Sequence, residues 1–249
     1  MKLKTSIESI SLGTNILDVK VPDELRKRHR SGLKYFDDAL GGRGFTPSCV
    51  SLFTGTPGAG KTTMMLELAN SLTGNGHVAL FNTAEESLYQ LKMTVERLKL
   101  KYGFVAGQET YVPRLLENCD ILRKKNPNKA FFLIVDSLQC LNDGKYGENQ
   151  VNSKTAQRSL QLITDYCKQH FCNAIIIGQV NKDGKMAGAN VLKHIVDAML
   201  SVDVELKDPD LKGCRVLQVH KNRFGGSGHT FFLKLRESGF TEIGRTSAL

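Results

Sequence analysis

The hydrophobic positions of this chain fall into short apolar runs that alternate with stretches of helical spacing. Each of four β-prone runs is followed by polar or glycine-rich residues, and the runs lie at 49–54, 78–82, 130–135 and 174–177. Apolar residues at helical spacing follow the runs and predict helices between the strands. Four groups of residues show this helical spacing: Met64, Met65, Leu68, Ala69 and Leu72; Leu88, Leu91, Val95 and Leu98; Leu115, Cys119 and Leu122; and Ala156, Leu160, Ile163 and Cys167. This alternation predicts an α/β fold with a mostly parallel sheet and helices on both of its faces.

The last third of the chain has a different pattern. Residues 198–206, 215–220 and 230–235 are β-prone, and the segments between them are short and lack helical spacing. Strands joined without a crossover helix pair in antiparallel fashion. We therefore expect antiparallel strands added to one edge of the sheet near the C-terminus.

The first 30 residues are polar and weakly patterned, so we predict an arm or linker over 1–30 ahead of one α/β domain over 31–249. Pro22-Asp23-Glu24 predicts a short helix, because proline is tolerated in the first turn and acids suit its positive end. The basic run 26–30 is interpreted as a solvated face or tether; contact with a phosphate backbone and docking on a neighbouring subunit are the alternatives. Apolar spacing followed by glycines predicts a helix over 33–40.

The composition is that of an ordinary globular domain, with 41% hydrophobic and 24% charged residues among 249. Lysine and arginine number 34 against 25 acidic residues, which gives a net charge of +9. A basic excess of this size suits a polyanionic partner such as a nucleic acid, although many basic proteins bind none.

The six cysteines are scattered and contain no C-x-x-C pair, which argues against a zinc site and against a disulfide framework. Buried free thiols in a reducing compartment are the simpler interpretation. The residues after Met1 lack the apolar core of a signal peptide, and no stretch approaches the roughly 18 apolar residues of a membrane helix. We therefore expect a cytoplasmic protein with neither zinc nor a membrane partner.

The most informative stretch is G-x-x-x-x-G-K-T at residues 55–62, a phosphate loop. Its glycines allow backbone N–H groups to approach and surround phosphates. Lys61 is expected to reach the β- and γ-phosphates of ATP, and the Thr62 hydroxyl to ligate Mg²⁺. A β-prone run precedes the motif and a helical pattern follows it, which is the order that such a loop requires. The predicted nucleotide-binding residues are Gly55, Thr56, Pro57, Gly58, Ala59, Gly60, Lys61, Thr62 and Thr63.

Acidic residues close two of the apolar runs. Ligands of parallel sheets bind beyond the carboxyl ends of the strands, so these residues are candidates for catalysis. Asp136 follows the run 130–135 and is expected to hold the magnesium ion; an acid that caps the next turn is the alternative. Glu85 and Glu86 follow the run 78–82, and one of them, preferably Glu85, is expected to orient and deprotonate the attacking water.

Polar residues after the later runs supply further candidates. Gln179 follows the run 174–177 and could sense the γ-phosphate, with an ordinary strand-end amide as the alternative. The loops 142–154 and 181–190 are candidates for a DNA path, in which lysines would meet phosphates and a tyrosine would stack on a base. Solvent-exposed loops without a ligand are the alternative. The candidate DNA-contacting residues are Lys145, Tyr146, Lys182 and Lys185.

Taken together, these motifs resemble the core of RecA-type ATPases. The phosphate loop is followed by Ala84-Glu85-Glu86-Ser87 and by Val135-Asp136-Ser137-Leu138-Gln139. The stretch 178–197 is similar to the RadA (Sms) family of bacterial branch-migration helicases. Lys221-Asn222-Arg223-Phe224-Gly225 matches that family's K-N-R-F-G signature, and the segment 32–42 resembles its lead-in. The resemblance covers roughly residues 30–245.

The resemblance implies a RecA fold assembled as a hexameric ring or filament, with ATP and Mg²⁺ bound between subunits. On this likeness Lys221 and Arg223 would reach the γ-phosphate of the neighbouring subunit, where such cations stabilise transition-state charge. Turn cations or DNA contacts are the alternatives for both residues. The family's four-cysteine zinc module and Lon-like domain have no counterpart in this sequence, and Gln179 stands where the family more often has histidine.

Two functions fit these observations. The first is a DNA-dependent ATPase that acts on single-stranded or branched DNA in recombination, repair or replication and hydrolyses ATP at subunit interfaces, with helicase or translocase activity as an extension. The second is a KaiC-like, nucleotide-gated oligomeric regulator without DNA binding. A small-molecule phosphotransferase is disfavoured, because the tandem acids and the late Lys-x-Arg suit hydrolysis and a kinase excludes water.

Overall fold

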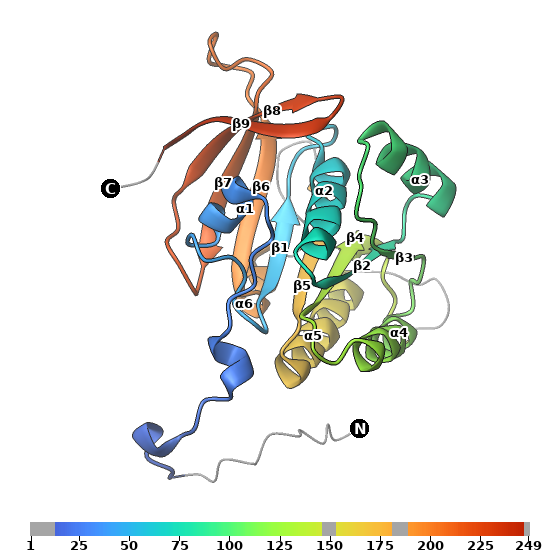
Figure 1. The fold of residues 1–249 in the computed structure, drawn as a ribbon, viewed down its shortest axis with the longest axis vertical. Helices are drawn as coiled ribbons and strands as arrows, with labels where there is room; N and C mark the ends of the chain where they lie inside the picture. The colour runs from blue at the N-terminus through green and yellow to red at the C-terminus, as the bar shows by residue number, and fades with distance from the viewer. Residues whose placement is uncertain (1–12, 146–152, 181–188, 247–249) are drawn as a thin grey trace.

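The computed structural model describes residues 13–145, 153–180 and 189–246, and within them the chain forms a central sheet flanked by helices (Figure 1). The strands are β1 (Val50–Thr54), β2 (Val78–Thr83), β3 (Val105–Gly107), β4 (Phe131–Asp136), β5 (Asn173–Ile177), β6 (Ala198–Val204), β7 (Arg215–Asn222), β8 (Thr230–Arg236) and β9 (Gly239–Thr246). The helices are α1 (Lys34–Ala39), α2 (Lys61–Gly74), α3 (Leu88–Arg97), α4 (Val112–Lys125), α5 (Ser153–His170) and α6 (Ala189–Ile195), with 3-10 turns η1 (Ile16–Asp18), η2 (Asp23–Arg26) and η3 (Leu138–Cys140).

The strand order in the described sheet is β3-β2-β4-β5-β1-β6-β7-β8-β9. All pairs from β3 through β6 are parallel. The strands β7, β8 and β9 join beyond β6 as antiparallel neighbours. The predicted parallel sheet with antiparallel strands at its C-terminal edge is therefore confirmed. β6, expected to be the first antiparallel strand, is instead parallel to β1 and antiparallel only to β7.

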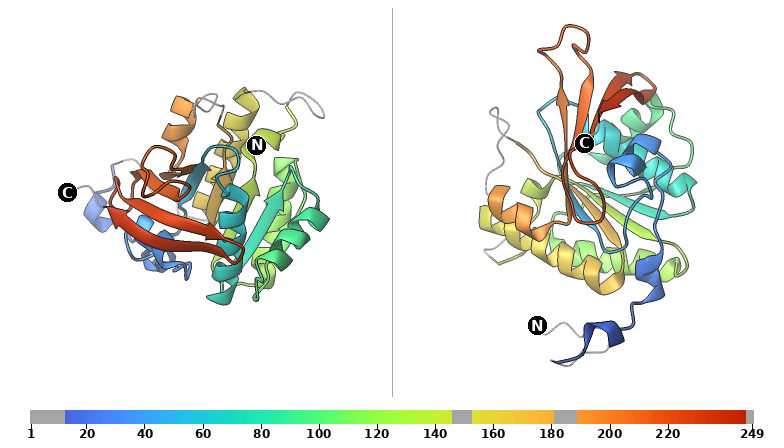
Figure 2. Two further views of the ribbon diagram at one scale, coloured as in Figure 1. Left: turned by 90° about the horizontal axis from the view of Figure 1, so that it is seen from above. Right: turned by 90° about the vertical axis from the view of Figure 1, so that its left-hand side faces the viewer.

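Helices cover both faces of the parallel strands, as Figure 2 shows. Successive strand side chains point to opposite faces, and β2 illustrates the consequence. Ala79 and Phe81 belong to the same buried cluster as α2, whereas Val78 and Leu80 belong to the cluster of α4 and α5. Burial on both faces explains the continuous apolar runs in the sequence. Among the described residues, no helix combines the length and the hydrophobicity needed to cross a membrane.

Three elements, β3, β9 and α6, were not predicted from the sequence. β3 has three residues, none of them fully buried, so it shows no hydrophobic alternation. β9 pairs with β8 along its length but keeps most of its side chains at least partly exposed. α6 begins at Ala189, at the end of the segment predicted to be a loop.

The arm before α1 extends below the sheet, at the end where the parallel strands begin (Figure 1). The 3-10 turn η2 confirms the short helix predicted after Pro22. Further on, the backbone of His29 pairs with that of Phe45 through N···O contacts of 2.9 and 2.8 Å. Arg28 donates to the hydroxyl of Thr46. The second half of the basic run is thus attached to the domain, while Lys27 is exposed.

The turn after α1 packs against the turn after β7. Gly41 has a φ of +98°, and a Cβ built on it would lie 3.2 Å from the Cα of Gly225. A Cβ on Gly225 would in turn lie 3.0 Å from the Cα of Gly41 and from the carbonyl oxygen of Leu40. Two backbone segments are therefore in direct contact, which only glycine permits. The lead-in segment and the K-N-R-F-G stretch form one packed unit.

Candidate functional site

The phosphate loop leaves the carboxyl end of β1 and leads directly into α2. β1 lies between β5 and β6, so the loop emerges near the middle of the sheet. Gly58 and Gly60 have φ values of +76° and +98°, in the left-handed region that other residues rarely adopt. The first turn of α2 then presents its N–H groups, and the amino end of a helix favours an anion.

A cavity of about 510 Å³ opens over this loop. Its walls come from the phosphate loop, the first turn of α2 and the segments that follow the carboxyl ends of three parallel strands. Residues predicted from separate motifs meet here: Lys61 and Thr62 face Glu85, Asp136 and Gln179 across one space. The cavity is therefore the candidate nucleotide site.

Lys61 lies against the loop that it belongs to. Its Nζ donates to the carbonyl oxygens of Gly55 at 2.9 Å and Thr56 at 3.1 Å. Burial lowers the pKa of Lys61, and the negative charges of Asp136 and Glu85 oppose that shift. The ammonium group thus lies over the backbone of the loop that is predicted to bind phosphates.

Thr62 and Asp136 form the part of the site that suits a magnesium ion. The Thr62 hydroxyl donates to Asp136 Oδ2 at 2.6 Å. Burial raises the pKa of Asp136 to about 6, which the Thr62 hydrogen bond opposes and Glu85 reinforces. A poorly solvated carboxylate gains from a nearby cation, and Mg²⁺ binds through one or two carboxylates plus phosphates and waters. These residues fit Mg²⁺ bound together with a nucleotide.

The two adjacent acids after β2 differ in their contacts, although the charges of both raise the pKa of Asp136. Glu85 lines the cavity, where its Oε1 accepts hydrogen bonds from the hydroxyl of Ser137 and, at 2.7 Å, from Nε2 of Gln179. The peptide oxygen of Glu86 instead accepts a bond from Thr83 Oγ1 at 3.0 Å, in the turn that leads into α3. Glu86 is absent from the described cavity lining.

Gln179 is positioned by the side chain of Gln139, which was not among the predicted site residues. Gln139 accepts from the backbone N–H of Gln179 at 3.1 Å and donates to its carbonyl at 3.3 Å. This two-way contact fixes the backbone from which the Gln179 amide reaches Glu85. Ser137 and Gln139 both lie in the V-D-S-L-Q stretch. Their position shortly after Asp136 could have identified them from the sequence as site residues.

β6 and the antiparallel strand β7 beside it support the phosphate loop from the side. Asp203, near the end of β6, accepts the backbone N–H of Thr56 at 3.0 Å. Arg215, at the start of β7, donates from Nε to the carbonyl of Ala59 at 3.3 Å. Neither residue was predicted, because both act on a loop about 150 residues earlier in the chain.

The β8–β9 hairpin reaches the same loop. A Cβ placed on Gly60 would lie 2.9 Å from the ring of Phe240, so the aromatic ring lies directly on the loop. Glu67 of α2 holds this hairpin, since both of its carboxylate oxygens lie 3.1 Å from the N–H of Phe240. Burial raises the pKa of Glu67 to about 7, and the Phe240 hydrogen bond opposes that shift.

Lys221 and Arg223 lie at the other end of the sheet, where β7 ends beside the start of β6. Lys221 Nζ donates to the carbonyls of Lys193 at 2.6 Å and Val196 at 2.7 Å. Arg223 pairs with the buried Asp197 at 3.1 Å and keeps 47% of its side chain exposed. The structure does not bring these two cations into the cavity of their own chain.

The predicted DNA-contacting residues are largely outside the described ranges. Lys145 is exposed at the end of the range 13–145. Tyr146, Lys182 and Lys185 lie outside the described residues.

Comparison with known sequences identifies relatives of the chain, although no family model matches it. It is 30% identical over 226 residues to the DNA repair protein RadA of Aquifex aeolicus and 32% identical over 223 residues to that of Haemophilus influenzae. The Escherichia coli RadA is 30% identical over 223 residues. These alignments cover 90%, 89% and 89% of this chain but 48%, 46% and 46% of the relatives. The chain thus spans about half the length of the curated relatives it matches.

Comparison with solved structures identifies the fold. One solved ATPase domain matches with a TM-score of 0.75 at 15% identity, over 89% of this chain and 93% of that one. A DnaB-like replicative helicase also gives a TM-score of 0.75 at 15% identity, over 88% of this chain and 62% of that one. The predicted RecA-type fold and the predicted resemblance to RadA are both confirmed.

Proposed function

We propose that this chain, a RecA-type fold that resembles RadA over about 90% of its length, is an ATPase core that acts on single-stranded or branched DNA. One observation carries the proposal: the phosphate loop, the Thr62–Asp136 pair and Glu85 converge on one cavity. The relatives are named as DNA repair proteins, and a net charge of +9 suits a polyanion. Recombination, repair and replication are all compatible with such a core.

The phosphate loop, Lys61, Thr62 and Asp136 are assigned to the binding of ATP. Backbone N–H groups of the loop and the amino end of α2 surround the phosphates, and Lys61 adds a point charge at the β- and γ-phosphates. Thr62 and Asp136 would hold Mg²⁺, which when bound neutralises charge on the phosphate oxygens. The ammonium of Lys61 is thereby assigned to the β- and γ-phosphates, and the carboxylate of Asp136 to the Mg²⁺ that would accompany them.

Hydrolysis needs a base that orients and deprotonates water, and we assign this role to Glu85. Ser137 and Gln179 fix its carboxylate through hydrogen bonds to the same oxygen. Gln179 also connects Glu85 to the segment after β5, so its amide can couple the state of the γ-phosphate to that segment. Glu86 is absent from the described cavity lining and is not assigned a catalytic role.

Lys221 and Arg223 are assigned to the cavity of the next subunit. Their distance from their own cavity and the exposure of Arg223 support this assignment. A cation supplied in trans requires a head-to-tail interface, which generates a ring or a filament. The carbonyls at the end of α6 and the carboxylate of Asp197 would hold both cations in place.

The trans assignment can be tested by mixing two inactive variants, Glu85→Gln and Arg223→Ala. In a mixed assembly, an Arg223→Ala subunit keeps its own Glu85 and receives Arg223 from a Glu85→Gln neighbour. With random 1:1 mixing, about a quarter of the interfaces combine both intact groups, so about a quarter of the wild-type ATPase rate should return. An activity that stays at the level of the separate variants would contradict the assignment, provided that sedimentation shows mixed assemblies.

The DNA assignment is tested by the ATPase rate with and without single-stranded DNA at two salt concentrations. Stimulation by DNA that declines with salt, at roughly 0.7 counterions released for each phosphate contact, is the expected result. An ATPase that assembles yet ignores DNA at low salt would instead favour a nucleotide-gated regulator of the KaiC-like kind.

A further inference from the structure

A second and larger cavity, of about 860 Å³, lies at the opposite end of the sheet from the nucleotide cavity. It is formed by the arm before α1, by the connection from α4 to β4 and by the residues after α5. Phe131, at the start of β4, lines it, whereas Asp136, at the end of the same strand, lines the nucleotide cavity. The two cavities therefore lie at the two ends of the same strand, β4.

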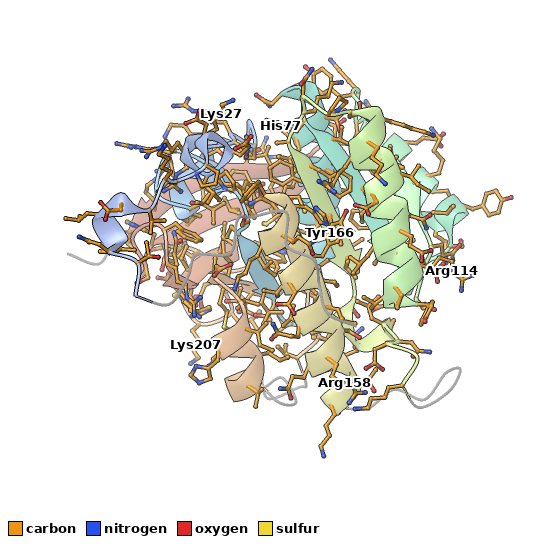
Figure 3. All side chains as sticks on the ribbon, turned by 90° about the horizontal axis from the view of Figure 1, so that it is seen from below. Lys27, His77, Arg114, Arg158, Tyr166 and Lys207 are labelled. Carbon is orange, nitrogen blue, oxygen red and sulfur yellow. The ribbon has the colours of Figure 1, made fainter. Side chains whose placement is uncertain are left out.

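Four cations line this cavity, Lys27, Arg123, Lys124 and Lys129, against two acids, Glu24 and Asp120. Arg123 already has partners within the chain, since it pairs with Asp120 at 2.8 Å and contacts the hydroxyl of Tyr166. The three lysines are exposed and form no ion pair among the described residues. Figure 3 views this end of the molecule, with Lys27 on the arm and Tyr166 on α5.

Helix dipoles account for only part of this arrangement. Arg123 and Lys124 lie in the last turn of α4, where the helix dipole favours cations. Lys27 and Lys129 lie outside any α-helix, so this effect does not explain why they face the same space. Repulsion among exposed cations is tolerated when a polyanion offsets it.

The two histidines of the cavity are affected by its positive charge. Burial lowers the pKa of His29 to about 4, and His77 and Lys27 lower it further. Burial also lowers the pKa of His170, together with the charges of Arg123 and Lys124. An anion bound in the cavity would oppose these charges and raise both pKa values.

The walls suit a phosphate backbone better than a protein partner. Protein interfaces are anchored by large apolar side chains, and none of the described residues with large exposed apolar side chains lines this cavity. The amides of Asn126 and Asn128 and the lysines instead provide donors at several points of the wall. Phosphate contacts of nucleic acids are made by lysine, arginine and asparagine in this way.

We propose that the cavity lined by Lys27, Lys124 and Lys129 binds the sugar-phosphate backbone of nucleic acid. The contact depends on charge and carries no base recognition. This inference rests on the proposed function, since it names a surface for the DNA on which the ATPase acts. DNA at this end and ATP at the other would contact the two ends of β4.

The test compares two triple variants of the full chain with equal changes in charge. Lys27→Ala/Lys124→Ala/Lys129→Ala removes the free lysines of the cavity. Lys101→Ala/Lys207→Ala/Lys212→Ala removes three exposed lysines elsewhere and serves as the matched control. Binding of a fluorescent single-stranded oligonucleotide is measured over a salt series with a non-hydrolysable ATP analogue present.

The cavity variant should lose about 2 from the slope of log affinity against log salt, and roughly 100-fold in affinity at 0.1 M salt, because about 0.7 counterions accompany each contact. The control should keep the wild-type slope. The ATPase rate without DNA should be unchanged in both variants, which shows that they fold. In the wild-type protein, DNA should raise the pKa of His29 and His170, measured by NMR.

The outcomes separate this inference from the proposed function. A wild-type protein that binds no DNA at low salt would contradict the proposed function itself. A wild-type protein that binds DNA, with a cavity variant that keeps the same affinity and slope, would overturn the inference alone. Loss of affinity for polyglutamate, with DNA binding intact, would assign the surface to an acidic protein and also overturn it.

Discussion

The parallel strands and the antiparallel strands contribute to the nucleotide cavity in different ways. The parallel strands end at it, and Glu85, Asp136 and Gln179 follow or close their carboxyl ends. The rest of the sheet, β6 together with the antiparallel strands β7 to β9 (called the antiparallel half below), passes beside the phosphate loop and holds its backbone, through Asp203 of β6 and the ring of Phe240. The chemistry of the site thus comes from one half of the sheet, and the conformation of its loop depends on the other half.

This difference predicts two kinds of mutational effect. Removing the proposed base from the parallel half should stop a chemical step and leave binding in place. Removing a support from the antiparallel half should weaken nucleotide binding or change stability and leave the chemistry of bound ATP nearly intact.

The largest effect is expected for Glu85→Gln, which keeps the shape of the side chain but removes the base. The rate of hydrolysis should fall by about 10²–10⁴-fold, since this is the usual contribution of general-base catalysis. ATP affinity should stay within a few-fold of wild type, measured with a fluorescent nucleotide alongside single-turnover hydrolysis. The neighbouring Glu86→Gln is the matched control; a larger loss there than at Glu85 would contradict the assignment.

A smaller effect is expected from the support at Asp203. Asp203→Ala removes the acceptor of the Thr56 N–H and should weaken ATP binding roughly 10-fold or more, because a hydrogen bond to a charged group is worth about 1.5–3 kcal/mol. Asp203→Asn keeps an acceptor and removes a negative charge that faces the phosphates, so its affinity should equal or exceed that of wild type. Tighter binding by both variants, measured by calorimetry, would show that Asp203 acts through charge alone.

The smallest effect is expected at Glu67, which holds the β8–β9 hairpin. Its pKa of about 7 lies above the ordinary value of 4.5, so the fold favours the protonated acid. The stabilisation is complete below about pH 4.5 and is lost as the pH rises through 7. Glu67→Gln stays neutral and should lack this pH dependence.

Thermal unfolding of wild type and Glu67→Gln between pH 5 and pH 8 checks this expectation. The Tm of wild type should fall relative to that of the variant as the pH rises, by about 2–4 °C for each kcal/mol. Glu117→Gln, an exposed acid on α4, should follow wild type. A constant difference between wild type and Glu67→Gln across this range would contradict a titrating Glu67.

The parallel half could be predicted from the sequence because its signals are local. Both faces of β4 are covered by helices, so Phe131 to Val135 appear as an unbroken apolar run with Asp136 at its end. The phosphate loop can likewise be recognised from eight consecutive residues. Each candidate catalytic residue then follows from its position after a run, without knowledge of the pairing between strands.

The supports of the antiparallel half could not be predicted, since they depend on contacts between distant segments. Asp203 reaches Thr56 only because β6 pairs with β1 in one register, with Phe53 opposite Leu200. Glu67 looks like a solvent-facing acid of α2 until the β8–β9 hairpin is placed on it. The three-residue β3 and the partly exposed β9 give no hydrophobic alternation from which to predict them.

The contact between Gly41 and Gly225 constrains how this sequence can change. A larger side chain at one position cannot be compensated at the other, because that partner is already the smallest residue and the obstructing atoms are main chain. The turn after α1 and the turn after β7, which are far apart in the chain, must therefore be kept together when the sequence changes. Anyone who transplants the K-N-R-F-G turn onto another scaffold would have to carry the glycine turn after α1 along with it.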